Sequence, residues 1–472
     1  MKKRSLWLSA AGALVVAVTL AGCGSTTYFA GRNLPPSGLV NRVMIAIQNP
    51  SSLAKGSLQI VDAYYDTRYA YNNINKTFPV GGFSGALPVS IQNMPEEQVG
   101  AVYSSGDGSL AMISYAKESS SGTQSGLNGV SSSVYITHDQ AYIIAASQQQ
   151  HVLTVVDKAG GNSYGLSLPG VYRVSVNPGG TVALAFVQNS NYVYYPRKLT
   201  AAETLDYSGG PSSWPMNAED CEPQNAPAWC LFQAADANGT PLTFDRPIKA
   251  VFSSDGGTAY VLNCGQECGG TASSITLLPT APMIFRVSQA SGTLPSQGSL
   301  TTIPIPGGAS NALVTSSTMY VVGQQLQTDG LFTGNLTVVN LANNTASSPI
   351  AISDGAPGAP SRLILADDNT LWIAMTKCNN GERYAKGLPY GCLTMFNTAT
   401  NSVTQIEPYQ GDATGIADVE GLHKIYAVEG GQVYIFTTTD GTALDNQYVT
   451  VTGTASDVAY IDAHSDSNNT VY

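Results

Sequence analysis

The sequence predicts an all-β protein, a single closed β-propeller of four-stranded blades. Three observations predict this fold: the composition, a strand–turn–strand phrase that recurs along the chain, and two incomplete repeats at its ends. Charged residues make up only 11% of the 472 residues, whereas Gly (48), Pro (25) and Tyr (25) are plentiful. Few charges combined with many turn formers and β-formers favour numerous short strands.

The repeat is clearest from Pro247 to Asn263, which read PIKAVFSSDGGTAYVLN. Two β-runs flank a turn at residues 254–257, where Asp and Gly tolerate the positive φ of tight hairpins. In most copies a third run and a weaker fourth run follow. Short antiparallel strands that repeat every roughly 40 to 60 residues are typical of a β-propeller. Looser copies of the phrase begin at Ser132, Val171, Ser310, Ser361 and Thr414.

The two ends of the chain predict how the ring closes. The first repeat, residues 41–66, lacks an opening strand, and Thr454–His464 is an opening strand without the rest of a blade. Together they would complete the first blade of a propeller that spans residues 42–472. The opening strands predict eight blades, or seven if the irregular copy from Leu87 to Gly129 is an insertion. They lie near Val89, Val134, Val174, Ala250, Leu313, Leu363, Ile416 and Val458.

Two of the copies, SSDGGTAYVLN and STMYVVG, resemble the YVTN-type β-propeller repeat. In that repeat a Pro-Asp-Gly turn precedes Tyr-Val and a small polar residue. The resemblance covers most of the chain after the N-terminal segment, although each copy is degenerate, and it implies the propeller fold. Propellers serve as binding platforms, hydrolases and quinone-dependent dehydrogenases, so this fold does not by itself select a function.

The N-terminus predicts export. Lys2, Lys3 and Arg4 precede an apolar run from Leu6 to Leu20, which is too short for a transmembrane helix across roughly 30 Å of hydrocarbon. Residues 1–22 therefore predict a secretory signal peptide. The run ends in LAGC, residues 20–23, which resembles the lipobox of bacterial lipoproteins at each position.

The lipobox resemblance implies that Cys23 is the first residue of the exported chain and carries a diacylglycerol on its sulfur. Because one acyl chain holds a protein only marginally and two or more hold it stably, Cys23 would anchor the protein to a membrane. Gly24 stands where an Asp favours retention in the inner membrane, so the outer membrane is favoured. Residues 23–41, rich in Gly, Ser, Thr and Pro, predict a lipidated flexible tether.

The charge of the chain excludes one class of partner. The sequence has 21 Lys and Arg against 32 Asp and Glu, a net charge of −11. The signal peptide removes three basic residues, which leaves 18 against 32, or −14. Because nucleic-acid binders need a basic surface to displace counterions, nucleic acid is not expected as a partner.

The six remaining cysteines form three couples that are close in sequence. Six cysteines allow 15 pairings, and we expect neighbours to pair because each couple encloses a loop with Gly or Pro. Disulfides suit an exported chain, whereas a zinc site would usually show two residues between its cysteines and a nearby His. The expected disulfides are Cys221–Cys230, Cys264–Cys268 and Cys378–Cys392.

Few residues suit catalysis or metal binding, and we assign no catalytic residue, metal or cofactor. A channel metal would need several acidic residues on the opening strands, which are chiefly apolar or small, with Asp418 and Asp457 as exceptions. Residues 462–469 alternate oxygen donors like a calcium loop but lack its Gly and distal Glu, which favours a polar tail. The four histidines are expected to be exposed turn residues: His138, His151, His423 and His464.

A long insertion at residues 199–245 is the predicted recognition element. It is rich in Pro and aromatic residues and contains one expected disulfide. Tyr and Trp supply large contact areas in binding sites, although a lid that packs these aromatics onto its own blade is the alternative. The candidate binding residues are Tyr207, Trp214, Trp229 and Phe232.

These observations favour a lipid-anchored, extracytoplasmic β-propeller that acts as a binding platform for a protein or glycan of the cell envelope. The anchor makes the membrane a second partner. The alternative is a propeller enzyme with its site in the central channel, either a lactonase-like hydrolase or a quinone-dependent dehydrogenase. The binding platform is preferred because no catalytic motif was found.

Overall fold

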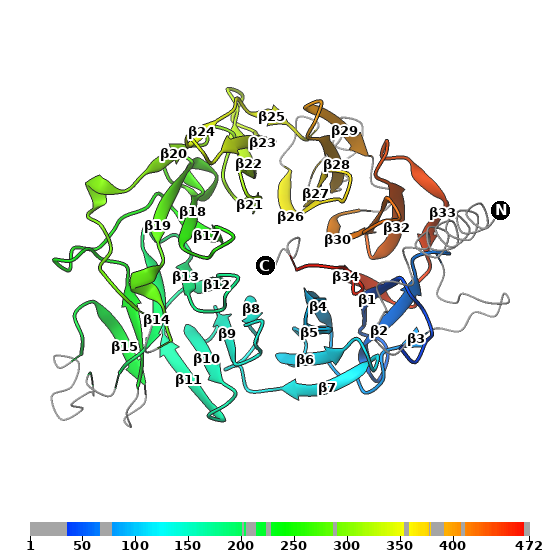
Figure 1. The fold of residues 1–472 in the computed structure, drawn as a ribbon, viewed down its shortest axis with the longest axis horizontal. Helices are drawn as coiled ribbons and strands as arrows, with labels where there is room; N and C mark the ends of the chain where they lie inside the picture. The colour runs from blue at the N-terminus through cyan, green and yellow to red at the C-terminus, as the bar shows by residue number, and fades with distance from the viewer. Residues whose placement is uncertain are drawn as a thin grey trace, which may run out of the picture.

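The chain folds into an eight-bladed β-propeller in which each blade is an antiparallel sheet (Figure 1). The computed structural model describes residues 35–66, 78–200, 203, 214–222, 228–286, 290–353, 358–376, 378, 391–406 and 411–466. The predicted fold class is thereby confirmed with eight blades. Cys23 and Tyr207 lie outside the described residues. Within the described part, no helix is long and apolar enough to span a membrane.

The first four blades follow the chain around one half of the ring. Blade 1 contains β1 (Arg42–Asn49), β2 (Lys55–Asp62), β3 (Phe78–Pro79) and β34 (Thr454–Tyr460). Blade 2 contains β4 (Pro88–Met94), β5 (Val99–Ser104), β6 (Ser109–Ser114) and β7 (Ser119–Gln124). Blade 3 contains β8 (Ser133–Ile136), β9 (Tyr142–Ser147), β10 (Val152–Asp157) and β11 (Asn162–Ser167). Blade 4 contains β12 (Val171–Val176), β13 (Ala183–Val187), β14 (Val193–Lys198), β15 (Ala218–Glu222) and β16 (Trp229–Gln233).

The other four blades complete the ring. Blade 5 contains β17 (Pro247–Phe252), β18 (Thr258–Asn263), β19 (Ser274–Pro279) and β20 (Thr302–Pro304). Blade 6 contains β21 (Asn311–Val314), β22 (Thr318–Leu326), β23 (Phe332–Asn340), β24 (Thr345–Ala346) and β25 (Ile350–Ala351). Blade 7 contains β26 (Ala359–Leu365), β27 (Thr370–Thr376), β28 (Cys392–Asn397) and β29 (Ser402–Ile406). Blade 8 contains β30 (Ala413–Val419), β31 (Lys424–Glu429), β32 (Gln432–Thr437) and β33 (Ala443–Val449). Short 3₁₀ turns are η3 (Gly265–Cys268), η4 (Ala281–Met283) and η5 (Gln297–Ser299).

The irregular copy from Leu87 to Gly129 is a complete blade, so the seven-blade alternative is wrong. Its strands β4 to β7 pair in sequence order like those of the other blades. The outermost strand, β7, reads SSSGTQ and is largely solvent-exposed, so it buries little and needs no apolar alternation. That polar edge explains the weak sequence signal.

The predicted insertion at residues 199–245 is partly a strand of the propeller. Its residues Trp229–Gln233 form β16, the fourth strand of blade 4, and Ala218–Glu222 form β15 at the outer edge. Cys221 lies directly opposite Cys230 in this pairing, and the two form a disulfide. The expected recognition loop therefore contains a two-stranded extension of the blade.

All three expected neighbour disulfides are present. Besides Cys221–Cys230, they join Cys264 to Cys268, at the start of η3, and Cys378 to Cys392, at the start of β28. A disulfide restricts the unfolded chain more when it closes a longer loop. Cys378–Cys392 spans 14 residues and Cys264–Cys268 only 4, so the former is expected to stabilise the fold more.

The hydrophobic core lies between neighbouring blades. One apolar cluster joins blade 8 to blade 1 and includes Val428, Ile435 and Ile45. Another joins blades 3 and 4 and includes Leu166 and Trp229. Each sheet thus buries its faces only against its two neighbours, which makes closure of the ring a condition for a complete core.

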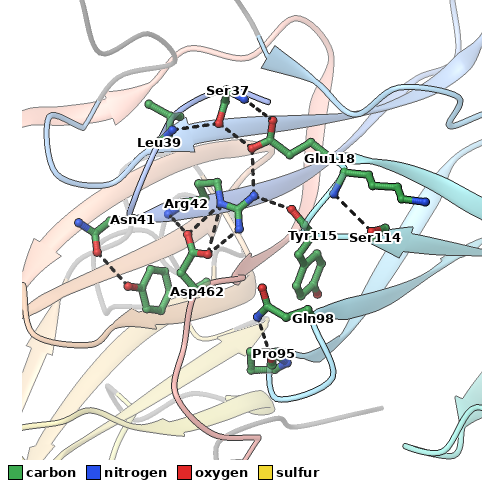
Figure 2. Close-up of polar contacts among 12 residues, drawn as sticks. Ser37, Leu39, Asn41, Arg42, Pro95, Gln98, Ser114, Tyr115, Glu118 and Asp462 are labelled. Atoms are coloured by element: carbon green, nitrogen blue, oxygen red, sulfur yellow. Dashed lines mark hydrogen bonds and ion pairs between the residues drawn. The ribbon is translucent and has the colours of Figure 1, made fainter. Parts of the chain in front are cut away.

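The ring closes through β34, which pairs with β1 in blade 1 although more than 400 residues separate them. Figure 2 shows the polar network beside this pairing. Arg42 of β1 is 1% exposed, and its Nη2 lies 2.6 Å from Asp462 Oδ1, just after β34. Its Nη1 lies 3.0 Å from Glu118 Oε1 and donates to the Tyr115 carbonyl in blade 2. The Arg42 guanidinium therefore connects β1 to the segment after β34 within blade 1, and connects blade 1 to blade 2.

Replacing the closing arginine should destabilise the whole ring. Arg42→Met leaves Asp462 and Glu118 buried without their cation, and breaking a buried ion pair in this way costs about 3–5 kcal/mol. We expect a loss of that size in the free energy of unfolding, measured by urea denaturation. The matched control is Arg197→Met, because the Arg197–Glu203 pair is partly exposed and should be worth about 1 kcal/mol or less. Equal losses in the two variants would contradict the closing role.

Candidate functional site

The innermost strands of the ring carry basic residues that the sequence analysis missed. Arg173 on β12, Lys249 on β17 and Arg362 on β26 each directly follow a register shift in the pairing with the second strand of the blade. Such β-bulges re-aim side chains. In Figure 1 these three strands lie nearest the central channel. The innermost strands are chiefly apolar or small, as predicted, but three of them also carry one basic residue each.

Lys249 is a buried cation without a carboxylate partner in the described part of the chain. Its Nζ donates to Asn311 Oδ1 at 2.8 Å. Burial, together with the positive charges of Arg173 and Arg362, lowers the pKa of Lys249 to about 7. Among the described residues, Arg173 also forms no ion pair; its guanidinium lies 5.5 Å from the centre of the Tyr172 ring.

Arg362, by contrast, is paired. Its Nη2 contacts Asp457 Oδ2, and both side chains are buried. The backbone N–H of Ile91 donates to the same carboxylate oxygen at 2.7 Å. Burial raises the pKa of Asp457, and the Arg362 charge opposes that rise. Asp457, one of the two predicted inner acids, thus neutralises a channel cation and braces blade 1 against blades 2 and 7.

The second predicted inner acid, Asp418, lines a pocket at one end of the channel, which we call the channel-mouth pocket. Its walls come from β4, β26, β30, β34 and the chain just after β34. About 50 Å³ is open to the centres of water-sized probes, enough for a few water molecules or one small polar group. Its polar residues are Asn93, Arg362, Asp418, Glu420, Tyr460 and Ser465, and its larger apolar residues are Ile91, Ile364, Ile416 and Val458.

Asp418 is the most unusual group in this pocket. The carboxylate is 5% exposed, and its Oδ2 accepts a hydrogen bond from the Asp367 backbone N–H at 3.2 Å. Its Oδ1 is buried and has no hydrogen-bond partner among the described residues. Burial raises the pKa of Asp418 to about 8, and the negative charges of Asp367, Glu420 and Asp368 contribute to the rise. A buried oxygen left unpaired is destabilising by about 1–3 kcal/mol, so it marks a place where a ligand would be stabilised.

The segment after β34, residues 461–466, crosses the channel mouth, and we call it the tail. Both the backbone N–H and Nδ1 of His464 contact Glu420 Oε2, at 2.9 and 2.8 Å. Asp466 Oδ2 lies 2.9 Å from His138 Nδ1 in the β8–β9 turn, and its backbone N–H donates to Glu96. The tail thus bridges turns of blades 2, 3 and 8 and covers the pocket with Ala463 and Ser465.

The histidines lie largely where the sequence places them, in or beside exposed turns, but three of them contact carboxylates. His138 and His464 hold the tail, and His423 Nδ1 lies 3.4 Å from Asp367 Oδ1. His151 accepts a long hydrogen bond from the Gly170 N–H. Residues 462–466, the described part of the 462–469 segment, belong to this tail, and no group of three His, Cys, Asp or Glu within the described residues could hold a metal ion.

The predicted aromatic recognition residues do not form one exposed surface. Trp229 is 1% exposed and packs against Tyr142, Tyr164 and Phe285. Phe232 is also buried, and Trp214 is half-buried against a small cluster in blade 4. The expectation is wrong for Trp229 and Phe232, because β16 turns them into the interior as blade residues. The alternative of aromatics packed onto their own blade holds for Phe232, which stacks on Tyr195 of blade 4, whereas Trp229 packs against Tyr142 and Tyr164 of blade 3.

Comparison with solved structures supports the fold. The dihydro-heme d1 dehydrogenase NirN, solved in complex with DHE, matches with a TM-score of 0.50 at 10% identity over 89% of this chain and 75% of that one. Hydrazine synthase from Kuenenia stuttgartiensis gives 0.48 at 12% identity over 75% and 96%. Apo AztD from Citrobacter koseri gives 0.47 at 11% identity over 89% and 97%. No family model and no curated protein matches the sequence. The similarity to NirN supports the fold alone.

The unpaired carboxyl should make stability fall as pH rises. Because the pKa of Asp418 is raised to about 8, the folded chain binds more protons than the unfolded chain between the ordinary carboxyl pKa and pH 8, and stability is lost across that window. Asp418→Asn should remove the loss and be about 1–3 kcal/mol more stable than the parent at pH 8. Urea denaturation at pH 5 and pH 8 measures both values. A variant less stable than the parent at pH 8 would contradict this account.

The contact between the tail and blade 3 should weaken as pH rises. The hydrogen bond to Asp466 raises the pKa of His138 above its ordinary value, so the stabilisation is complete at acidic pH and is lost as pH rises through the folded-state pKa. Hydrogen exchange of the amides of residues 461–466, corrected for intrinsic rates, should therefore be faster at pH 8 than at pH 6. His138→Gln should abolish the difference. Equal pH dependence in the variant would show that another group holds the tail.

Proposed function

We propose that this chain is a lipid-anchored, extracytoplasmic binding protein of the cell envelope that receives its ligand at the channel mouth. Three disulfides in the described residues support an oxidising compartment. The lipobox that ends at Cys23 supports anchoring by acyl chains, with the outer membrane favoured. A protein or glycan of the envelope would carry the group that is bound.

One observation carries the binding role: a rigid channel wall holds buried polar groups that the protein itself leaves unsatisfied. Within the described part of the chain, Asp418 Oδ1 has no hydrogen-bond partner, and Lys249 bonds to the Asn311 amide oxygen and forms no ion pair with a carboxylate. Such groups destabilise the folded state. They are stabilised when a ligand of complementary charge replaces the water that the site excludes, and a preorganised site loses little entropy on binding.

The alternative, an enzyme with its site in the channel, has one observation in its favour. Because the pKa of the Asp418 carboxyl is raised to about 8, this group can donate a proton near neutral pH, as a general acid does. A lactonase-like hydrolase would then open a panel of aliphatic lactones at a rate that Asp418→Asn lowers by at least 100-fold. Lactone opening by the variant at the parent rate would exclude this role of Asp418.

Membrane anchoring is tested by replacing the sulfur atom of Cys23. The full chain, expressed with its signal in a Gram-negative host fed labelled palmitate, should incorporate the label and sediment with membranes. Cys23→Ser replaces sulfur by oxygen, so no thioether forms, and the label should disappear. Cys264→Ser/Cys268→Ser is the matched control, because these sulfurs are already joined to each other. Retention of the label in Cys23→Ser would contradict the anchor.

Binding is tested by capture with matched channel variants. The full chain in detergent would be incubated with solubilised envelope, and the retained protein or glycan identified by mass spectrometry. Retention should be reduced at least tenfold by Asp418→Asn or by Lys249→Met, and it should persist in Asp255→Asn, which changes an exposed turn of blade 5. A ligand retained equally by all variants would place binding away from the channel.

A further inference from the structure

Only one of the two carboxylate oxygens of Asp418 has a hydrogen-bond partner among the described residues. One of its oxygens accepts the Asp367 N–H, whereas the other, Oδ1, is buried and has no partner among the described residues; Asp418 itself lines the channel-mouth pocket. Buried carboxylates are nearly always hydrogen-bonded or paired. The missing partner is therefore a donor that enters the pocket from outside the described residues.

The charges around the pocket favour a cationic donor. Asp367 and Asp368 in the β26–β27 turn and Glu420 in the β30–β31 turn all raise the pKa of Asp418 by their negative charge. The basic side chains of the channel wall and the tail at this pocket already have acidic partners: Arg362 contacts Asp457, and His464 contacts Glu420. A bound positive charge would relieve the repulsion among the carboxylates.

The remaining groups that face the pocket do not cancel this field. His423 contacts Asp367 at 3.4 Å, and its side chain is 61% exposed, so water screens it. In the tail, Asp466 adds another negative charge, which His138 balances. Asn93 and Tyr460, which also line the pocket, are joined to each other through the Asn93 amide and the Tyr460 carbonyl. The mouth as a whole is therefore acidic.

The size and walls of the pocket narrow the class of cation. About 50 Å³ for water-sized probes admits an ammonium group, and Ile91, Ile364 and Ile416 offer apolar contact to a short methylene stem. A divalent metal would need several converging oxygen ligands, and the described residues contain no group of three metal-ligating side chains that could hold one.

From these features we propose that the channel-mouth pocket binds a primary ammonium group on a short unbranched aliphatic stem, with Asp418 Oδ1 as its principal acceptor. A free alkylamine and the end of a lysine side chain share this chemistry. The inference rests on the proposed binding function and names the group that the channel mouth recognises.

Binding should be coupled to release of a proton. The ammonium ion pairs with the ionised form of Asp418, whose pKa is about 8 in the empty pocket. Affinity should therefore rise about tenfold from pH 6.5 to pH 7.5 and level off above pH 8, with one proton released per ligand at the lower pH. The bound amine itself stays protonated throughout, because alkylamine pKa values resemble that of Lys, about 10.4.

Calorimetric titration of the full chain in detergent with n-butylamine tests the proposal. We expect binding to the parent at pH 8.5, at least tenfold weaker binding to Asp418→Asn, and unchanged binding to Asp255→Asn. Titration in two buffers of different ionisation enthalpy measures the released proton. The neutral analogue n-butanol should not bind measurably, because it lacks the charge.

Each outcome has a defined meaning. Equal binding of n-butylamine to the parent and Asp418→Asn, or equal binding of n-butanol and n-butylamine to the parent, would overturn the ammonium site. Displacement of n-butylamine by micromolar Ca²⁺ or Mg²⁺ would overturn it in favour of a metal. If Nα-acetyl-lysine amide binds and n-butylamine does not, the source is a lysine side chain, and the reverse result indicates a free amine.

The proposed function and this inference fail separately. If capture of an envelope ligand depends on Lys249 and not on Asp418, the proposed binding function is supported and the proposed ammonium site is contradicted. If n-butylamine binds through Asp418 but no envelope ligand is captured, the ammonium site is supported and the proposed envelope protein or glycan partner is contradicted.

Discussion

The buried guanidinium of Arg42 is the interaction on which the rest of the structure depends. A propeller blade is stable only between two neighbours, so the ring has no core until its last gap is closed. Here the gap is closed by pairing of β34 with β1, and Arg42 contacts a carboxylate from each side of the join. Two buried anions and one buried cation would each be costly alone. Together they are satisfied only in the closed ring, so they favour that arrangement over open ones.

Polar side chains on the opening strands also connect neighbouring blades by hydrogen bonds. Gln92 donates to and accepts from the backbone of Ile136 in the next blade, and Ser133 exchanges bonds with the backbone of Val174. Because each bridge crosses from one blade to the next, a shift in one sheet is resisted by both neighbours. The channel wall is consequently rigid, which is what a preorganised binding site requires.

Most of the fold could be predicted from the sequence because hairpin turns and apolar strands repeat, and because the incomplete first and last repeats fit each other. Blade 4 was predicted only in part. Its fourth strand, β16, lies within the long insertion at residues 199–245 rather than directly after β14, so the repeat pattern did not identify it as a strand. The channel cations were missed because a β-bulge, which no alternation pattern reveals in one sequence, precedes Arg173, Lys249 and Arg362. Asp418 and Asp457 were predicted as acidic residues of the inner strands. Their different surroundings could not be predicted, because the contacts come from residues far away in the sequence: Asp367 for Asp418 and Arg362 for Asp457.

The position of the tail has a consequence for biogenesis. The strand that seals the ring and the segment that lines the pocket beside it are consecutive, Thr454–Tyr460 and residues 461–466, and both follow every other described strand in the sequence. A chain that stops before Thr454 lacks both at once, so its first blade stays open. Formation of the channel-mouth pocket thus depends on the same stretch of chain that closes the ring, and molecules truncated before it would present unpaired strand edges to proteases.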